Sequence, residues 1–298
     1  MRFGVGSVTK TTIAAATLKL EEEGLLSLND EIGDWITLTS EHVDPSIKII
    51  QLLNHFSGIV RFMGHEGLWP VVEADLDATI STEEMFSFIG EPLSQKGATH
   101  SYSNSNYLIL SMIIEAATQQ TVGEVLRTRF WTPLDLDEIY FGANETVTGP
   151  IAGAWRDSDR KGTLEDIADE WRTAYHSVFY GQAGIFSTAS ALSMWAQHLF
   201  GGSVLSLVSR NRMITTYITG SDAVYTGYGL GVRRNVYGGR TMWGHTGGVR
   251  GYGALMFYDP IGDISVAVLN NQSLSINGGE LRHELFEEIM TELIASLK

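Results

Sequence analysis

The 298-residue sequence contains no cysteine. Disulfide bonds, thiolate metal ligands and a cysteine nucleophile are therefore excluded, and the redox compartment stays undetermined. Basic residues are also few, with 20 lysines and arginines against 35 aspartates and glutamates, which gives a formal net charge of −15 at pH 7. No run of basic residues interrupts this acidic balance, so we expect neither nucleic acid nor an anionic membrane as a partner.

Long apolar runs are missing as well. The most apolar stretch, residues 107–114, is interrupted by Ser111 and is too short to span a bilayer. The first four residues do not form a signal peptide. With 44% hydrophobic and 18% charged residues, the composition is that of a globular protein with a sizeable core. As written, the sequence predicts a soluble protein that is not exported, and we expect it in the cytoplasm.

Three motifs that would indicate other chemistry are absent. No Gly-x-Ser-x-Gly elbow occurs, which disfavours a different hydrolase fold. No His-Glu-x-x-His occurs and the eight histidines are scattered, so we expect no catalytic metal. A nucleotide-binding fold would need Gly-x-Gly-x-x-Gly before a helix, or a Gly-Lys pair, and the chain has neither. We expect no cofactor.

One stretch near the start combines small residues with chemically capable ones. Gly4 and Gly6 precede Ser7, and an Ala- and Leu-rich run follows and closes at Gly24. This pattern predicts a buried helix that begins at or just before Ser7. Lys10 would share a face with Ser7, about 5–6 Å away at Cβ. The positive helix end and desolvation would lower the pKa of Lys10, so that its amine could take the Ser7 proton.

A serine with an amine beside it is a candidate nucleophile, but the short motif alone leaves an alternative open. Ser7 could be an ordinary helix N-cap with a solvated lysine nearby. The same Ser-x-x-Lys pattern recurs at residues 158–161, in a polar stretch that no buried helix follows.

The rest of the chain predicts an α+β fold, with a mainly helical middle and an antiparallel C-terminal sheet flanked by helices. Two segments in the middle are less regular: we expect a loop at 60–77, either over a small apolar cluster or as a pocket wall, and a helix near 164–171. The clearer predictions are helices at 47–55, 107–118, 189–200, 206–218 and 279–297, and strands at 228–232, 240–243, 253–258 and 264–270.

This order of elements predicts a single catalytic unit built of two interleaved lobes. The helical lobe is expected at about 25–200, and the α/β lobe combines 1–24 with about 220–298. Residues with large apolar side chains are candidates for an acyl pocket, among them Phe62, Trp69 and Phe141.

Two further motifs carry polar groups that could act together. Tyr102 and Asn104 form the only Tyr-x-Asn in the chain, in a small-residue loop just before a predicted buried helix. A buried tyrosine with a satisfied hydroxyl is the alternative explanation for Tyr102. His245, Thr246 and Gly247 follow a predicted strand, among glycines that let a substrate or an oxyanion approach the backbone closely. A glycine-rich hairpin without a catalytic role is the alternative there.

The joint occurrence of these motifs resembles the serine β-lactamase and penicillin-binding protein family. Ser-x-x-Lys at a helix start, Tyr-x-Asn in the middle and His-Thr-Gly on a strand correspond to the three active-site motifs of that family. The connecting segments at 52–59, 184–189 and 244–248 are similar too. The likeness extends over essentially residues 3–298, and it is strongest to the class C β-lactamase-like group. That group includes family VIII carboxylesterases, D,D-carboxypeptidases and D-aminopeptidases.

The resemblance implies a β-lactamase/transpeptidase-like fold and catalysis through an acyl-enzyme. Ser7 would attack a carbonyl carbon, Lys10 would remove its proton, and Tyr102 would pass a proton to the leaving group. The backbone N–H groups of Ser7 and Gly248 would form the oxyanion hole. The implied substrate-binding residues are Asn104, His245, Thr246 and Gly247, with His245 bonded to Tyr102 or to a substrate acceptor.

Two departures from the family pattern change the expectation. The third motif starts with His245 where many β-lactamases have lysine, which removes a permanent positive charge and lowers the expectation of strong β-lactamase activity. The family also carries some tens of residues before its serine, which supply a helix and two strands of the sheet. If the sheet lacks those strands, an exposed edge remains, and we expect a homo-oligomer in which a second chain covers it.

The expected activity is that of a serine hydrolase on small ester or amide substrates, with carboxylesterase-type hydrolysis favoured. D,D-carboxypeptidase or D-aminopeptidase activity on D-amino-acid peptides, or weak β-lactamase activity, is the alternative. A catalytically inactive ligand-binding relative is the alternative of another class, although such a protein has no chemical reason to keep Ser7, Lys10 and Tyr102 together.

Overall fold

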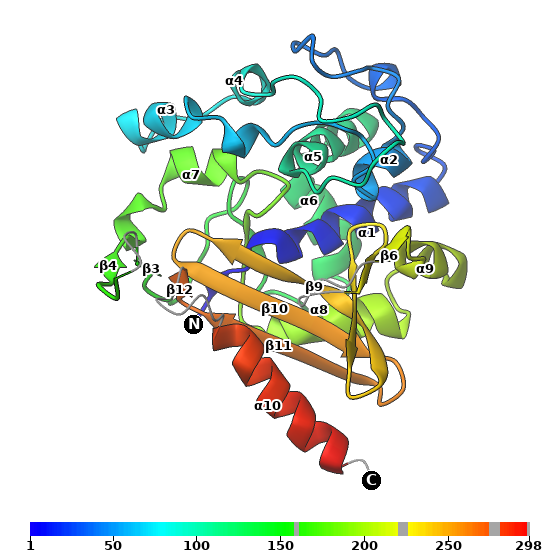
Figure 1. Cartoon of the computed structure of the whole chain (residues 1–298), viewed down its shortest axis with the longest axis vertical. Helices are drawn as coiled ribbons and strands as arrows, with labels where there is room; N and C mark the ends of the chain where they lie inside the picture. The colour runs from blue at the N-terminus through cyan, green and yellow to red at the C-terminus, as the bar shows by residue number, and fades with distance from the viewer. Residues whose placement is uncertain (158–160, 220–225, 274–280, 297–298) are drawn as a thin grey trace.

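The largest element of the fold is a six-stranded antiparallel sheet. The structure is a computed structural model that describes residues 1–157, 161–219, 226–273 and 281–296. The strand order is β11-β10-β9-β8-β7-β6. The strands are β6 (Ile218–Thr219), β7 (Gly227–Tyr228), β8 (Arg233–Tyr237), β9 (Arg240–Val249), β10 (Tyr252–Asp259) and β11 (Ile264–Asn270). Figure 1 shows this sheet in the lower part of the molecule, with most helices above it. The predicted α+β class is confirmed.

The helices lie on both faces of the sheet and in a layer above it (Figure 1). Their bounds are α1 (Thr9–Glu22), α2 (Ile49–Leu53), α3 (Leu68–Ala74), α4 (Thr82–Ser87), α5 (Asn104–Thr118), α6 (Val122–Leu126), α7 (Thr173–Val178), α8 (Ala189–Gly201), α9 (Leu207–Ile214) and α10 (Leu281–Ser296). A 3-10 turn, η1 (Gly6–Val8), leads directly into α1. The helix predicted from the first motif is therefore present and ends two residues before Gly24.

Strand β10 is buried along its whole length, and its side chains alternate between two apolar layers. Ala254 and Met256 face the main core, which includes residues of α1 and α8. Leu255 and Phe257 face the opposite side, where α10 contributes Phe286 to a second cluster. Because successive side chains of a strand point to opposite faces, one sheet can hold helices on both of its sides.

Helix α1 runs through the centre of the molecule. All of its residues from Thr9 to Leu18 are buried, so this part of the helix is enclosed on every side instead of burying one apolar stripe. Its buried threonines donate their hydroxyl protons to carbonyls of the preceding turn, as Thr11 does to Val8 and Thr17 to Ile13. These internal bonds satisfy polar side chains in a dry environment. A bond to another strand fixes the start of α1, because the Ile185 N–H donates to Thr9 Oγ1 at 3.3 Å.

The middle of the chain differs from prediction in two places. The predicted loop at 60–77 contains the helix α3, which buries Leu68 and Val72. The predicted helix at 164–171 is wrong: residues 165–166 form the short strand β4 (Glu165–Asp166), and a 3-10 turn follows. Tertiary contacts override the local pattern there, because the Trp171 indole N–H bonds to the Arg250 carbonyl at 2.9 Å and its ring packs on Phe179.

Several short strands were not predicted. Strand β1 (Phe3–Gly4) pairs with β5 (Ile185–Ser187), which also pairs with β2 (Tyr140–Phe141). A further small sheet contains β3 (Trp155–Arg156), β4 and β12 (Gln272–Ser273). The pairing of β1 with β5 places the start of the chain, and hence Ser7, next to residues near 185.

Strand β11 forms one edge of the six-stranded sheet as described. Helix α8 packs on β11, where the Ser193 hydroxyl bonds to the Ser265 carbonyl at 3.1 Å. Residues 189–200 of this helix were expected in the helical lobe, yet α8 packs on a strand that was expected in the α/β lobe. The division into two lobes stays a prediction. The homo-oligomer in which a second chain covers an exposed sheet edge also stays a prediction, and light scattering at high protein concentration tests it.

Candidate active site

Ser7 lies in the 3-10 turn at the start of α1, where its hydroxyl can meet a ligand. Its neighbours Gly6 and Val8 are buried, whereas Ser7 itself is partly exposed. The backbone just before the turn is anchored, because the Val5 N–H donates to the Ile185 carbonyl at 2.9 Å. The chain therefore presents one accessible hydroxyl from a fixed turn.

The Lys10 amine lies beside that hydroxyl in a fully buried position. Its Nζ is 3.1 Å from Ser7 Oγ and 3.0 Å from the main-chain oxygen of Gln182. Burial is the main cause that lowers the pKa of Lys10 well below its usual value, and the nearby Arg233 and Arg61 lower it further. A neutral amine can donate to the Gln182 carbonyl while its lone pair accepts the Ser7 proton. The spacing predicted from the sequence is present as a contact.

Acidic side chains do not counter this effect. Among the described residues, no carboxylate forms an ion pair with Lys10. Instead, the Lys10 nitrogen lies over two aromatic rings, 5.1 Å from the centroid of Tyr102 and 5.4 Å from that of Tyr107. A nearby carboxylate would stabilise the ammonium form of Lys10. Because none of the described residues supplies one in an ion pair with Lys10, the neutral amine is favoured.

Strand β9 presses its backbone against the turn that holds Ser7. A Cβ on Gly247 would lie 2.0 Å from the Val5 carbonyl oxygen and 2.9 Å from the Ser7 nitrogen. A Cβ on Gly6, whose φ is +53°, would lie 2.7 Å from the Gly248 nitrogen. Glycine is therefore required at both positions by space, and at Gly6 also by backbone conformation. The N–H groups of Ser7 and Gly248, predicted to form the oxyanion hole, belong to segments in direct contact.

Tyr102 lies in the loop before α5, close to the amine. Its ring packs on that of His55, with centroids 4.4 Å apart, and on the guanidinium of Arg233 at 5.7 Å. Both Tyr102 and Ser7 are only partly buried. The structure thus brings the phenol of the second motif and the serine–lysine pair of the first motif to one place.

Asn104 is the first residue of α5, and its carboxamide has one free acceptor. The Nδ2 group contacts the Met63 sulfur at 3.1 Å, whereas Oδ1 is buried without a hydrogen-bond partner among the described residues. A buried oxygen without a partner is unfavourable unless a ligand supplies the donor. This position is compatible with the predicted role in substrate binding.

The two polar residues of the third motif differ in what they contact. Thr246 Oγ1 accepts a hydrogen bond from the Arg233 guanidinium, which reaches across from the neighbouring strand β8. His245 is fully buried, with Nε2 3.2 Å from the Tyr228 hydroxyl and Nδ1 bonded to the Thr246 carbonyl. The sequence led us to expect a bond from His245 to Tyr102 or to substrate. Both of its nitrogens instead have partners in the protein, so the substrate-binding role of His245 stays a prediction that this geometry does not favour.

Four residues near the site were not identified from the sequence. They are His55, Gln182, Tyr228 and Arg233. Gln182 acts through its main-chain oxygen, which leaves no side-chain signal. Arg233 carries the only usable signal, since a cation on a strand next to the third motif could have been expected to compensate for the missing lysine.

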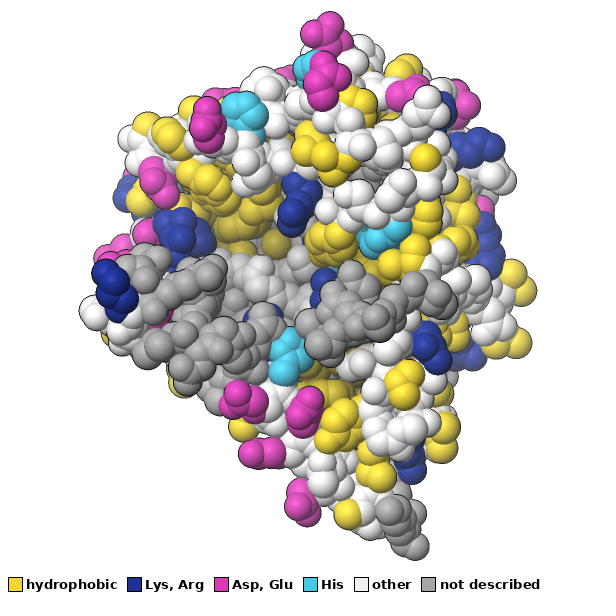
Figure 2. Space-filling model, viewed as in Figure 1, with side chains coloured by type: hydrophobic (Ala, Val, Ile, Leu, Met, Phe, Trp, Pro, Cys, Tyr) yellow, Lys and Arg dark blue, Asp and Glu magenta, His cyan; other side chains and the backbone are white. Residues whose placement is uncertain are grey.

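The surroundings of Lys10 are positive although the chain carries a net charge of −15. Arg233 and Arg61 both act on Lys10. In Figure 2 a hollow contains hydrophobic side chains and has Lys and Arg side chains around it, whereas most Asp and Glu side chains lie toward the outside. A local positive field of this kind attracts anionic ligands.

The three apolar residues proposed for an acyl pocket differ in how far they are exposed. Phe62 and Phe141 are fully buried in the main core. Trp69 is partly exposed and stacks on Tyr175, with the Arg250 guanidinium 5.8 Å from its ring centroid. Of the three, Trp69 remains the candidate for substrate contact.

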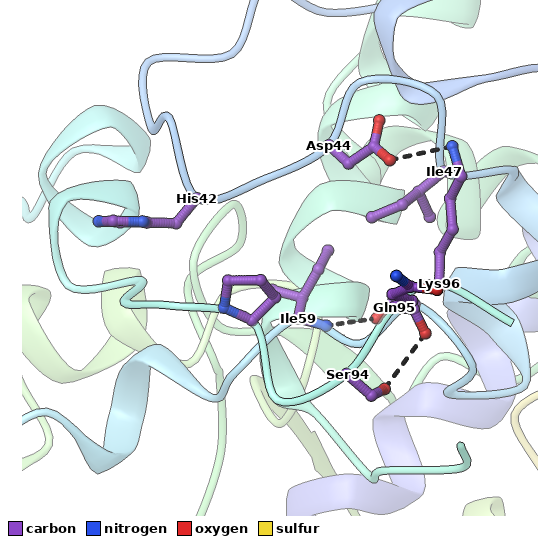
Figure 3. A pocket seen from close by; sticks show the side chains of 9 residues that line it. His42, Asp44, Ile47, Ile59, Ser94, Gln95 and Lys96 are labelled. Carbon is purple, nitrogen blue, oxygen red and sulfur yellow. Dashed lines mark hydrogen bonds and ion pairs between the residues drawn. The ribbon is translucent and has the colours of Figure 1, made fainter. Parts of the chain in front are cut away.

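A pocket of about 460 Å³, shown in Figure 3, has neither Ser7 nor Lys10 in its lining. Its wall includes Lys96 and Asp44, which form an ion pair at 2.9 Å. The other lining residues are His42, Ile47, Ser57, Ile59, Pro92, Ser94 and Gln95. None of the predicted catalytic residues lines it, so we do not place the chemistry there.

The sequence predicted neither a catalytic metal site nor a membrane-spanning segment. In the described part of the chain no group of three or more His, Cys, Asp or Glu side chains could hold a metal ion. No helix within the same residues is both long and apolar enough to cross a bilayer. The second Ser-x-x-Lys copy begins at Ser158, which lies outside the described residues.

The sequence model of the family described as Beta-lactamase matches residues 1–286. Penicillin-binding protein 4* of Bacillus subtilis is 23% identical over 265 residues, covering 85% of this chain and 57% of that protein. A Salmonella typhi protein described as a D-alanyl-D-alanine carboxypeptidase is 25% identical over 292 residues, covering 86% of this chain and 66% of that protein.

Among solved structures, the D-stereospecific amidohydrolase from Streptomyces sp. superposes with a TM-score of 0.84. It is 26% identical, and the match covers 94% of this chain and 84% of that one. The chain spans 57% and 66% of the lengths of the two curated relatives.

Proposed function

Because this chain belongs to the beta-lactamase family, a hydrolase family, we propose that it is a serine hydrolase that forms an acyl-enzyme on Ser7. The observation that carries the proposal is the contact between Ser7 Oγ and the buried Lys10 amine at 3.1 Å. The lowered pKa of Lys10, caused mainly by burial, leaves a larger share of this amine neutral, and so able to act as a base, than in an exposed lysine at the same pH.

In the first half of the reaction, Ser7 Oγ attacks the substrate carbonyl carbon while its proton passes to Lys10 Nζ. The carbonyl oxygen becomes an oxyanion, which the N–H groups of Ser7 and Gly248 bind. When the intermediate collapses, the bond to the leaving group breaks. The leaving group takes the proton from Lys10 through the Tyr102 hydroxyl, and the acyl group remains on Ser7.

In the second half, a water molecule attacks the ester carbon of the acyl-enzyme. The water proton passes through the Tyr102 hydroxyl to Lys10 Nζ, and the same two N–H groups bind the second oxyanion. Collapse returns the proton to Ser7 Oγ and releases the acid. Ser7 loses its proton in the first half and regains one in the second, and Lys10 gains and loses one proton in each half. The enzyme is therefore regenerated unchanged.

For the substrate we propose a small amide or peptide of a D-amino acid whose leaving group carries a free carboxylate. The Arg233 guanidinium, bonded to Thr246 Oγ1, supplies a permanent cation beside the third motif. It would provide the positive charge that is missing because His245 stands where many β-lactamases have lysine. Arginine binds carboxylates with two parallel hydrogen bonds. The names of the relatives, a D-alanyl-D-alanine carboxypeptidase and a D-stereospecific amidohydrolase, support this class.

Carboxylesterase-type hydrolysis is the second candidate. Esters need little assistance to their leaving group, so a serine activated by a neutral amine beside two oxyanion donors acts on them readily. The partly exposed Trp69 would then contact the acyl group.

The two candidates separate in one set of rate measurements. The substrates are an N-acyl-D-alanyl-D-alanine peptide, the same peptide with a C-terminal carboxamide, and a short-chain aryl ester. Peptidase function predicts that the free acid reacts faster than the carboxamide, and that Arg233→Gln removes this difference. The ester rate of Arg233→Gln should fall only by as much as the raised pKa of Lys10 explains. An ester rate equal to that of Ser7→Ala would contradict the serine hydrolase itself.

A further inference from the structure

A chain of three buried side chains connects the second motif to the third. His55 Nε2 lies 3.2 Å from the Tyr228 hydroxyl, which in turn lies 3.2 Å from His245 Nε2. All three residues are fully buried. We infer that Tyr228 and His55 are positioning residues that fix the tautomer of His245 and the distance between the two motifs. This inference rests on the proposed function of the same site.

The direction of the first bond follows from the donors around His55. The Ser103 backbone N–H donates to His55 Nδ1 at 3.2 Å. The Asn106 carboxamide also points its Nδ2 group at His55 Nδ1, at 3.0 Å, because its oxygen accepts the Ser57 hydroxyl proton at 2.7 Å. His55 Nδ1 therefore carries no proton, and in the neutral ring the proton must be on Nε2. His55 donates to Tyr228.

The direction of the second bond follows from the other end of the chain. His245 Nδ1 faces the Thr246 carbonyl, which can only accept, so the proton of the neutral ring is on Nδ1. His245 Nε2 must then accept, and the Tyr228 hydroxyl is its donor. Tyr107 also lies within hydrogen-bond reach of Tyr228, but an imidazole nitrogen is the more basic acceptor.

The direction of each pKa shift favours the neutral form of every member of the chain. Burial lowers the pKa values of His55 and His245 well below their usual range, and the charge of Arg233 lowers both further. Burial raises the pKa of Tyr228 well above its usual value. The donors and acceptors assigned above thus hold without a change of charge.

The backbone at His55 is held in an unfavourable conformation. Its φ is +62°, in the left-handed region that non-glycine residues seldom occupy. Such strain persists where surrounding contacts determine the position, and it is concentrated at functional sites. The His55 ring also packs on Tyr102. His55 thereby supports the phenol proposed to transfer protons in the reaction.

The chain explains what His245 does without touching substrate. It joins Ser103, next to Tyr102, to Thr246, which lies two residues before Gly248 on β9. If Tyr228 is lost, the two motifs can shift relative to each other. Displacements of about 1 Å in a catalytic arrangement can lower rates by about 100-fold.

The first test measures the tautomer directly. In the wild-type protein labelled with ¹⁵N-histidine, we expect His245 as a neutral ring protonated on Nδ1, and His55 as a neutral ring protonated on Nε2. Variants at each histidine assign the signals. A wild-type His245 that is protonated on Nε2, or that carries both protons at neutral pH, overturns the inference whatever any variant does.

The second test compares two tyrosines of the same sheet. Tyr228→Phe keeps the ring but removes the hydroxyl, and we expect kcat on an aryl ester to fall on the order of 10- to 100-fold with KM unchanged. The control is Tyr258→Phe on β10, whose hydroxyl bonds to Asp263 at 2.7 Å, away from the chain. It should leave kcat unchanged.

The outcomes also distinguish this inference from the proposed function. Wild-type protein that hydrolyses no ester contradicts the proposed function, and the tautomer measurement still decides the assignment of His245. Wild-type protein that is active, with Tyr228→Phe equal to Tyr258→Phe in kcat and with the His245 tautomer unchanged, contradicts the positioning role. A His55→Gln variant, which keeps a donor toward Tyr228, should retain more kcat than His55→Leu.

Discussion

The two ends of helix α1 carry the same kinds of residue in opposite surroundings. At the start, Lys10 is fully buried and its amine contacts the Ser7 hydroxyl and the Gln182 carbonyl. At the end, Lys19 is partly exposed and forms an ordinary ion pair with Glu22 at 3.2 Å. One helix thus holds both a lysine with a strongly lowered pKa and a lysine paired as a cation. Burial and the lack of a carboxylate partner distinguish them.

The glycines at the two ends differ in the same way. Gly247 packs against the backbone of the turn before α1, so that a Cβ would lie 2.0 Å from the Val5 carbonyl oxygen. Gly24 follows the last turn with φ +71°, and a Cβ there would meet no other atom within 4 Å. The first is required for a close approach of two catalytic segments, and the second only ends a helix.

The largest expected effect comes from exchanging the two lysines for alanine. Lys10→Ala removes the base and should lower kcat/KM on an aryl ester by about 10²- to 10⁴-fold. Lys19→Ala removes a surface ion pair and should leave kcat/KM unchanged, with a loss of about 0–1 kcal/mol in the free energy of unfolding. Equal activities of the two variants, with both folded by circular dichroism, would remove the distinction between the two helix ends.

The glycines give the next largest difference. Gly247→Ala forces β9 away from the Ser7 turn, and we expect loss of aryl ester hydrolysis together with a lower melting temperature. Gly24→Ala should keep full activity and lose only about 1–2 kcal/mol of stability through its left-handed backbone. Full activity in Gly247→Ala would mean that the contact between β9 and the turn is not needed for the oxyanion hole.

The pH dependence of activity tests the cause of the Lys10 shift. Lys10 must be neutral to act, so kcat/KM should rise with pH through its pKa. Arg233 lowers that pKa, and Arg233→Gln should therefore raise it and move the rising limb to higher pH. The neighbouring Arg234 bonds instead to Thr226 and Thr241, and Arg234→Gln should leave the limb in place. A rising limb that moves to lower pH in Arg233→Gln would contradict the conclusion that Arg233 lowers the pKa of Lys10.

The smallest effect is on stability. Because the pKa of Lys10 is lower in the folded state, the unfolded chain binds more protons between the folded pKa and about 10.4, the usual lysine value. The free energy of unfolding of the wild type should therefore gain a contribution that rises with pH across that window. Lys10→Met lacks this group, so the difference between the two proteins should shift in favour of the wild type as pH rises. If urea unfolding gives the two proteins parallel curves of unfolding free energy against pH, the lowered pKa of Lys10 is contradicted.

Local geometry explains what the sequence could predict. Ser7 and Lys10 lie on one helix three residues apart, and that spacing alone brings their side chains together. The strand predicted at 264–270 agrees with β11 because its apolar run is bounded by clear turns. The family resemblance supplied Tyr102 and the third motif, and the family is confirmed.

What the sequence could not predict depends on contacts between distant segments. Tyr228 and His55 are 173 residues apart and meet only when β7 lies beside the loop after α2. Gln182 contributes a backbone oxygen, which any residue would have. The helix wrongly predicted at 164–171 failed because the aromatic packing of Trp171 outweighs local propensity.

The most direct test of the central claim is the intact mass of the protein after incubation with a serine-reactive fluorophosphonate at neutral pH. The account predicts a single adduct on the wild type, none on Ser7→Ala, and a much slower reaction on Lys10→Ala than on Lys19→Ala. A folded wild-type protein that gains no adduct, or that gains the same adduct in Ser7→Ala, would contradict an activated Ser7.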